Sequence, residues 1–117
     1  MHGIDVLTTD GATVVSAQGE LDAYVAPDLS AALQRAAALA DGGVVIDLEE
    51  VAFMDSTALG VVVRAVRELG KTGRRVKVVL PRGTARRVFE ITTVDRVLPV
   101  AGSRALALHE LVAPVDS

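Results

Sequence analysis

The sequence contains no cysteine and only three aromatic residues among its 117 positions. The absence of cysteine excludes disulfides and thiolate metal sites. The shortage of aromatic residues indicates a core built from Val, Leu, Ile and Ala. No apolar run approaches the roughly 20 residues of a membrane span, and the N-terminus lacks the basic and then apolar pattern of a signal peptide. We therefore expect a soluble cytoplasmic protein that does not bind a membrane.

Charge is unevenly distributed along the chain, whose formal net charge is −3. Residues 1–63 hold ten acidic residues and one basic residue, whereas residues 64–117 hold eleven basic and five acidic ones. Such a division can mark a charged partner surface, or simply solvated helix faces. The basic stretch from Arg64 to Arg87 has no interleaved aromatic residues, so we expect no direct binding of nucleic acid.

Hydrophobic periodicity predicts strands that alternate with helices. Asp10 and Gly11 form a hairpin signal between two β-rich segments, and Pro27 suits the first turn of a helix. The second long helix is predicted to end at Gly70 or Gly73. By residue number, the predicted elements are strands 4–8 and 12–17, a helix from 27 to the glycines at 42 and 43, a strand 44–48, a loop 49–55, the second long helix from 56, a strand 76–80, a helix 84–91 capped by Thr84, a strand 97–100 and a helix 104–112 capped by Ser103.

This ββαβαβαβα order predicts an α/β fold with a mixed, mostly parallel sheet, an N-terminal β-hairpin and about four helices. Pro99 interrupts the strand over residues 97–100, which places that strand at an edge of the sheet. The run 44–48 is nearly continuously apolar, as in a strand covered on both faces. The length suffices for a single domain over residues 1–117, with its core over about 4–112.

The segment most suggestive of function is the loop before the second long helix, because functional groups gather where strands lead into helices. We expect Phe53 and Met54 to anchor this turn. Asp55, Ser56 and Thr57 follow at the first turn of the helix, and all three residue types are favoured helix caps. Three such residues are more than one cap requires. Ser56 is therefore either a cap or a surplus hydroxyl that can accept a phosphoryl group, which a helix N-terminus would stabilise.

Three blocks of the sequence resemble STAS domains, and in particular the anti-sigma factor antagonists. The first block is Gly19-Glu20-Leu21-Asp22 with Ala26-Pro27-Asp28-Leu29. The other two are Val45-Ile46-Asp47-Leu48 and Phe53-Met54-Asp55-Ser56-Thr57-Ala58-Leu59-Gly60. Their spacing also fits, so the resemblance covers about residues 4–112 and implies a STAS-type fold.

The resemblance implies a switch that is controlled by phosphorylation of Ser56. In that family the unphosphorylated protein binds an anti-sigma factor, which is a serine kinase, and thereby releases a sigma factor. Phosphorylation breaks this complex, and a separate serine phosphatase restores it. The chain itself is expected to need no cofactor and to be no enzyme, because the kinase supplies Mg²⁺ and the nucleotide.

By the same resemblance, the residues expected to contact the partner are Asp22, Asp55, Thr57, Ala58 and Gly60. Asp55 matches the family's Asp, and Asp22 matches an Asp that lies close to the acceptor in the fold. Thr57 is either a minor acceptor or simply the first helical residue. Ala58 stands where many members have Gly, and we expect its methyl group to narrow slightly the space beside Ser56.

Enzyme and receiver classes fit the sequence less well. A serine hydrolase needs a base for Ser56, but the chain has only His2 and His109, and no G-x-S-x-G motif surrounds Ser56. A phosphate-binding G-x-x-x-x-G-K motif is missing, and no two His or Cys residues have metal-ligand spacing. A response-regulator receiver needs further acidic residues after its first strand and a Lys after its last strand, which Thr8-Thr9-Asp10 and Ala101-Gly102 do not supply.

Within the STAS group, a binding module without a phosphorylation switch stays open as an alternative. Such a module would be a subunit of a stress-sensing assembly or an accessory domain of a transporter. The short chain without a sensor or transmembrane segment favours the antagonist, as does the Asp55-Ser56 pair. We expect the antagonist to be a monomer.

Overall fold

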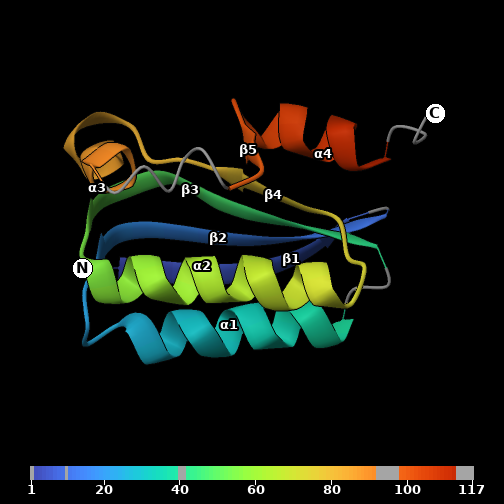
Figure 1. Ribbon diagram of the computed structural model, residues 1–117, viewed down its shortest axis with the longest axis horizontal. Coiled ribbons are helices and arrows are strands. Elements are labelled where there is room, and N and C mark those ends of the chain that lie inside the picture. The colour runs from blue at the N-terminus through green and yellow to red at the C-terminus, as the bar shows by residue number, and fades with distance from the viewer. Residues whose placement is uncertain (1, 10, 40–41, 92–97, 113–117) are drawn as a thin grey trace.

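The computed structural model describes residues 2–9, 11–39, 42–91 and 98–112, which form a five-stranded sheet with helices on both faces (Figure 1). In chain order, the elements are β1 (His2–Thr9), β2 (Ala12–Leu21), α1 (Ala26–Leu39), β3 (Gly43–Met54), α2 (Ser56–Lys71), β4 (Val76–Val79), the 3-10 helix η1 (Gly83–Arg86), α3 (Arg87–Ile91), β5 (Val100–Ala101) and α4 (Arg104–Val112). The predicted α/β class and order of elements are confirmed. Asp10, residues 40–41 at the end of the first predicted helix, and Val97 lie outside the described residues.

The five strands lie in the sheet in the same order as along the chain, from β1 at one edge to β5 at the other. β1 and β2 form the predicted antiparallel hairpin, whereas the pairs β2–β3, β3–β4 and β4–β5 are parallel. Parallel neighbours need a crossover connection, and α1, α2 and the α3 segment fill these three connections.

The helices form two unequal layers. α1 and α2 lie side by side over one face of the sheet, and α4 covers part of the other face (Figure 1). The larger core lies under α1 and α2, where Leu29, Leu33 and Val62 pack with strand residues such as Val15 and Ile46. Among the described residues, no helix is both long and apolar enough to cross a membrane.

The central strand β3 is longer than predicted, and the expected loop over residues 49–55 is wrong. β3 continues to Met54 because β2 also continues, to Leu21, and the two ends pair in parallel with Leu21 opposite Met54. The ladder shifts register twice, and Gly19 takes a positive φ of 83° beside the second shift. This extension places residue 55 just past the carboxyl end of the central strand β3, directly beside the segment that follows β2.

The segment after β4 forms a helix, as predicted, but its first turn is the 3-10 helix η1. Thr84 lies inside η1, and Arg82 occupies the N-cap position without a side-chain hydrogen bond. The predicted Thr84 cap is therefore wrong. The last strand β5 is an edge strand, as predicted, but it begins only at Val100, because a hydrogen bond from Val100 N to Leu98 O closes a turn before it.

The last helix, α4, is fixed by a cap and by an ion pair to the central strand. Ser103 Oγ accepts a hydrogen bond from Leu106 N at 3.1 Å, which confirms the predicted cap. Arg104 Nε donates to Asp47 Oδ2 at 2.8 Å, and the other oxygen of this nearly buried carboxylate accepts from Glu49 N at 3.0 Å. A charged residue in the middle of β3 thus holds the second helical layer in place.

The packing of α1 on the sheet yields a prediction for stability. Leu29→Ala should lower the free energy of unfolding by about 2–5 kcal/mol, because Leu29 is 0% exposed and its removal leaves a cavity. Leu39→Ala is the matched control, since Leu39 lies on the same helix but is 62% exposed, and it should change stability by about 0.5 kcal/mol or less. Urea unfolding of both variants measures the difference, and equal losses would contradict this description of the core.

Candidate functional site

Asp55 joins the end of β3, the start of α2 and the segment after β2. One carboxylate oxygen, Oδ1, accepts a hydrogen bond from Ala58 N at 3.0 Å, so Asp55 is the N-cap of α2. The other oxygen, Oδ2, accepts from Ala23 N at 2.9 Å. The backbone N–H of Asp55 donates to Leu21 O at 3.1 Å. Three hydrogen bonds therefore hold this carboxylate and its backbone between two segments that are distant in sequence.

The Asp22 side chain shapes the turn that leads into α1. Its Oδ1 accepts hydrogen bonds from Tyr24 N at 3.0 Å and Val25 N at 3.2 Å. Its carbonyl oxygen also accepts from Val25 N and Ala26 N. Leu21 and Ala23, the residues on either side of Asp22, are both hydrogen-bonded to Asp55. The structure therefore brings the Asp22 turn and the start of α2 together, as the sequence prediction requires.

Ser56 and Thr57 are the first two residues of α2, and both are exposed. Since Asp55 is the cap, the alternative prediction that Ser56 caps the helix is wrong. Within the part of the chain that the structure describes, no partner is bonded to the Ser56 hydroxyl. The N–H groups of this first turn have no carbonyl of the helix within reach, and the helix dipole adds roughly half a positive charge at this end. The position suits an anion.

The next residues of the motif differ from one another in exposure. Ala58 is 0% exposed and packs in the core, which corrects the prediction that its methyl group narrows the space beside Ser56. Gly60 is exposed, and a Cβ added to it would meet no atom within 4 Å. It lies one turn after Ser56, on the same side of the helix. The chain itself therefore has no packing reason for a glycine at position 60.

Two exposed aromatic residues flank Asp55, and neither was predicted as a site residue. Tyr24 is 88% exposed in the turn before α1, and Phe53 is 51% exposed near the end of β3. Of the two residues predicted to anchor the turn, Met54 is buried, whereas Phe53 is half exposed and does not anchor it by burial. The sequence could have indicated them, because two of its three aromatic residues lie two positions from a motif aspartate: Tyr24 follows Asp22, and Phe53 precedes Asp55.

The described residues offer little else for chemistry at this end of the sheet. They contain no group of three His, Asp or Glu side chains placed to hold a metal ion. His109 is exposed on α4, on the opposite face of the sheet from α2. His2 lies on β1, with its Nε2 3.9 Å from Asp28 Oδ2. The exposed hydroxyl, carboxylate and aromatic side chains around Asp55 are suited to binding.

Comparison with known proteins agrees with this arrangement. Residues 3–107 match the family model of the STAS domain. An anti-sigma-B factor antagonist of Listeria monocytogenes is 41% identical over 85 residues, which cover 70% of this chain and 72% of that protein. The crystal structure of an anti-sigma factor antagonist of Mycobacterium paratuberculosis is 33% identical and matches with a TM-score of 0.85, covering 95% of this chain and 94% of the other.

The Bacillus cell fate determinant SpoIIAA, also an anti-sigma factor antagonist, has the same fold and has been solved in two states. Its unphosphorylated form matches with a TM-score of 0.77 over 97% of this chain and 100% of its own. Its phosphorylated form matches with a TM-score of 0.68 over 92% and 98%. Both are 24% identical to this chain, so this likeness concerns the fold alone. On the family match and the more similar relatives, the chain belongs to the STAS-domain family of anti-sigma factor antagonists.

Proposed function

We propose that the chain is an anti-sigma factor antagonist that binds its anti-sigma factor through the N-terminal end of α2. We call the exposed residues around Asp55 the α2 N-terminal surface, made of Asp22, Tyr24, Phe53, Ser56, Thr57 and Gly60. Exposed aromatic side chains supply much of the binding energy at protein interfaces. Here two of them stand beside hydroxyl and carboxylate groups, a combination that favours a protein partner.

The observation that carries the proposal is that Asp55, and not Ser56, caps α2. Asp55 uses both carboxylate oxygens on backbone N–H groups. The Ser56 hydroxyl is thereby exposed at the helix N-terminus, with no structural bond to lose when it reacts. Ser56 is the acceptor that we propose for a phosphoryl group, and Thr57 is the only other hydroxyl in this turn.

Phosphorylation of Ser56 would act as an electrostatic switch. A phosphoryl group adds about 1.5–2 negative charges near pH 7. The chain itself tolerates them, because the free N–H groups and the dipole of α2 favour an anion there. A partner docked on this surface faces the same charge beside Asp55, in a contact from which water is excluded. A cost of about 3 kcal/mol would weaken binding roughly a hundredfold.

The circuit that we propose has the partners implied by the family. The unphosphorylated chain binds an anti-sigma factor, and this binding frees a sigma factor from it. The anti-sigma factor is also the ATP-dependent serine kinase, and a serine phosphatase removes the phosphoryl group again. The chain acts in the cytoplasm as a monomeric binding protein without a cofactor. Of the residues expected to contact the partner, Ala58 contributes through packing under the surface, because its side chain is buried.

The proposed acceptor can be tested with the cognate kinase and ATP. The chain should gain one phosphoryl group, measured by intact mass and peptide mapping, and Ser56→Ala should gain none. Ser103→Ala is the matched control, because Ser103 is also an N-terminal helix serine but its hydroxyl is engaged as the cap of α4. Ser103→Ala and Thr57→Ala should still be labelled.

The outcomes of this experiment separate the two proposals for the chain. Labelling of Ser56→Ala at another residue would refute the acceptor. Binding of the wild-type chain to the anti-sigma factor without any labelling would instead support the binding module that has no phosphorylation switch.

Gly60 provides a test of the binding surface that does not involve phosphorylation. Gly60→Gln and Gly70→Gln should each stabilise α2, by up to about 1 kcal/mol, because both glycines are exposed helix residues whose added Cβ meets no atom within 4 Å. Only Gly60→Gln should weaken binding to the anti-sigma factor, about tenfold or more, since Gly60 lies beside Ser56 and Gly70 lies near the other end of α2. Isothermal titration calorimetry measures both affinities, and equal values would place the partner elsewhere.

A further inference from the structure

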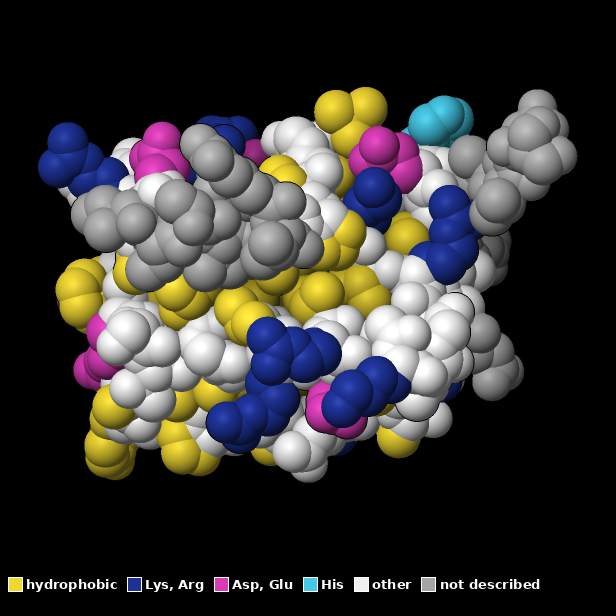
Figure 2. Space-filling view, viewed as in Figure 1, with side chains coloured by type: hydrophobic (Ala, Val, Ile, Leu, Met, Phe, Trp, Pro, Cys, Tyr) yellow, Lys and Arg dark blue, Asp and Glu magenta, His cyan; other side chains and the backbone are white. Residues whose placement is uncertain are grey.

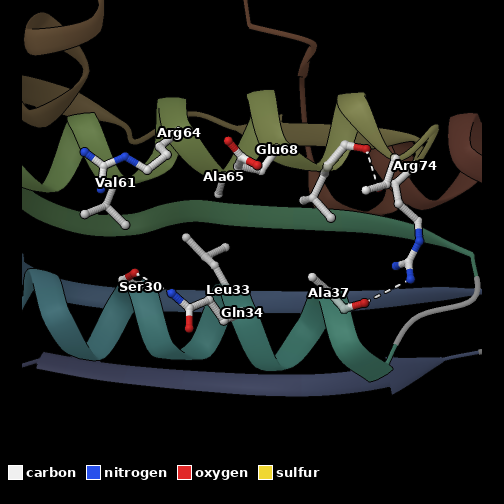
Figure 3. A pocket seen from close by; sticks show the side chains of 11 residues that line it. Ser30, Leu33, Gln34, Ala37, Val61, Arg64, Ala65, Glu68 and Arg74 are labelled. Atoms are coloured by element: carbon white, nitrogen blue, oxygen red, sulfur yellow. Dashed lines mark hydrogen bonds between the residues drawn. The ribbon is translucent and has the colours of Figure 1, made fainter.

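A groove between α1 and α2 has features of a small-molecule site. It encloses about 300 Å³, the lower end of the usual size of ligand pockets. Its apolar lining comes from facing positions of the two helices: Leu33, Ala37, Val61, Ala65 and Leu69. In Figure 3 the labelled side chains of Leu33 and Ala37 on α1 and of Val61 and Ala65 on α2 point into the space between the two helices. The groove begins at Val61, more than one helical turn after Ser56, and shares no residue with the α2 N-terminal surface.

Arg74 closes one end of the groove and has an unsatisfied hydrogen-bond donor. Its Nη2 donates to Ala37 O, the carbonyl of a residue in the last turn of α1, at 2.9 Å. Its Nη1 is buried and has no hydrogen-bond partner among the described residues. In Figure 3 the guanidinium extends from the segment after α2 across the end of the groove toward α1. A guanidinium is always charged, and a buried donor without a partner costs free energy that a bound acceptor would recover.

The charge around the groove also favours an anion. Arg64 lines the groove nearer its other end and, within the described residues, takes part in no ion pair. The one carboxylate that lines the groove, Glu68, lies 3.5 Å from the Nζ of Lys71. Lys and Arg side chains gather on this part of the molecular surface (Figure 2). The groove thus combines an apolar lining with an excess of positive charge.

From these features we propose that the groove binds a small amphipathic carboxylate, with its head group on Arg74 and its hydrocarbon between α1 and α2. A carboxylate matches the planar donors of a guanidinium. None of the described lining residues is aromatic, so a nucleotide base would have no ring to stack on, and the lining favours an aliphatic ligand over a nucleotide. Val61 and Leu69 lie about 12 Å apart along α2, at about 1.5 Å per residue. A medium-length aliphatic chain fits this distance.

Octanoate is the probe that tests the proposal. Titrated into the ¹⁵N-labelled chain, octanoate should cause saturable amide shifts in α1 and α2 around the groove, and octan-1-ol should bind at least about tenfold more weakly because it carries no charge. Arg74→Gln should lower the affinity for octanoate about tenfold or more. The matched control Arg67→Gln should bind as the wild type does, since Arg67 is an exposed arginine of α2 that does not line the groove.

A second variant tests the cavity itself, in case Arg74→Gln fails to fold. Ala65→Leu places a larger side chain in the groove and should abolish the shifts while the amide spectrum stays that of a folded protein. The proposal is overturned if octanoate gives no saturable shifts, if octan-1-ol binds as tightly, or if Arg67→Gln weakens binding as much as Arg74→Gln. Unchanged octanoate binding to Ala65→Leu would also overturn it. None of these results depends on the anti-sigma factor.

Discussion

The two hydrogen bonds accepted by the Asp55 carboxylate organise the end of the molecule where the proposed function lies. One bond, to Ala58 N, starts α2, and the other, to Ala23 N, holds the turn that starts α1. Both helices are thus tied to the sheet at the same point. Because one carboxylate meets both needs, the hydroxyl of Ser56 has no structural task. The proposed phosphorylation of Ser56 would therefore remove no helix cap.

The uneven charge of the sequence has a partial explanation in the fold. Bases of the second half pair with acids of the first half across the sheet, as Arg104 does with Asp47 at 2.8 Å and Arg82 with Glu49 at 2.9 Å. These pairs join α4 and the segment after β4 to the central strand β3. Arg64 and Arg74 differ from these bases, because they line the groove and neither pairs with an acid among the described residues. α2 therefore has an exposed hydroxyl at its N-terminal end and, with Arg74 from the segment after it, places two arginines without an acidic partner among the described residues along the groove.

Most of the fold followed from hydrophobic periodicity and turn residues, because those patterns report directly on which side chains are buried. The extension of β3 to Met54 did not, since Glu49 and Glu50 interrupt the apolar pattern and only pairing with β2 makes that segment a strand. The site was predictable as a motif, but the division of roles within it was not. Asp55 and Ser56 are equally good caps in sequence terms, and the contact of Asp55 with Ala23, 32 residues away, distinguishes them.

The proposed function requires that charge added at Ser56 controls binding at the α2 N-terminal surface. The most direct measurement is calorimetric titration of the anti-sigma factor with the same chain before and after stoichiometric phosphorylation, with Mg²⁺ and ADP held constant. We expect the phosphorylated chain to bind the anti-sigma factor about a hundredfold or more weakly, while its amide spectrum shows an intact fold. Equal affinity of the two forms would contradict it.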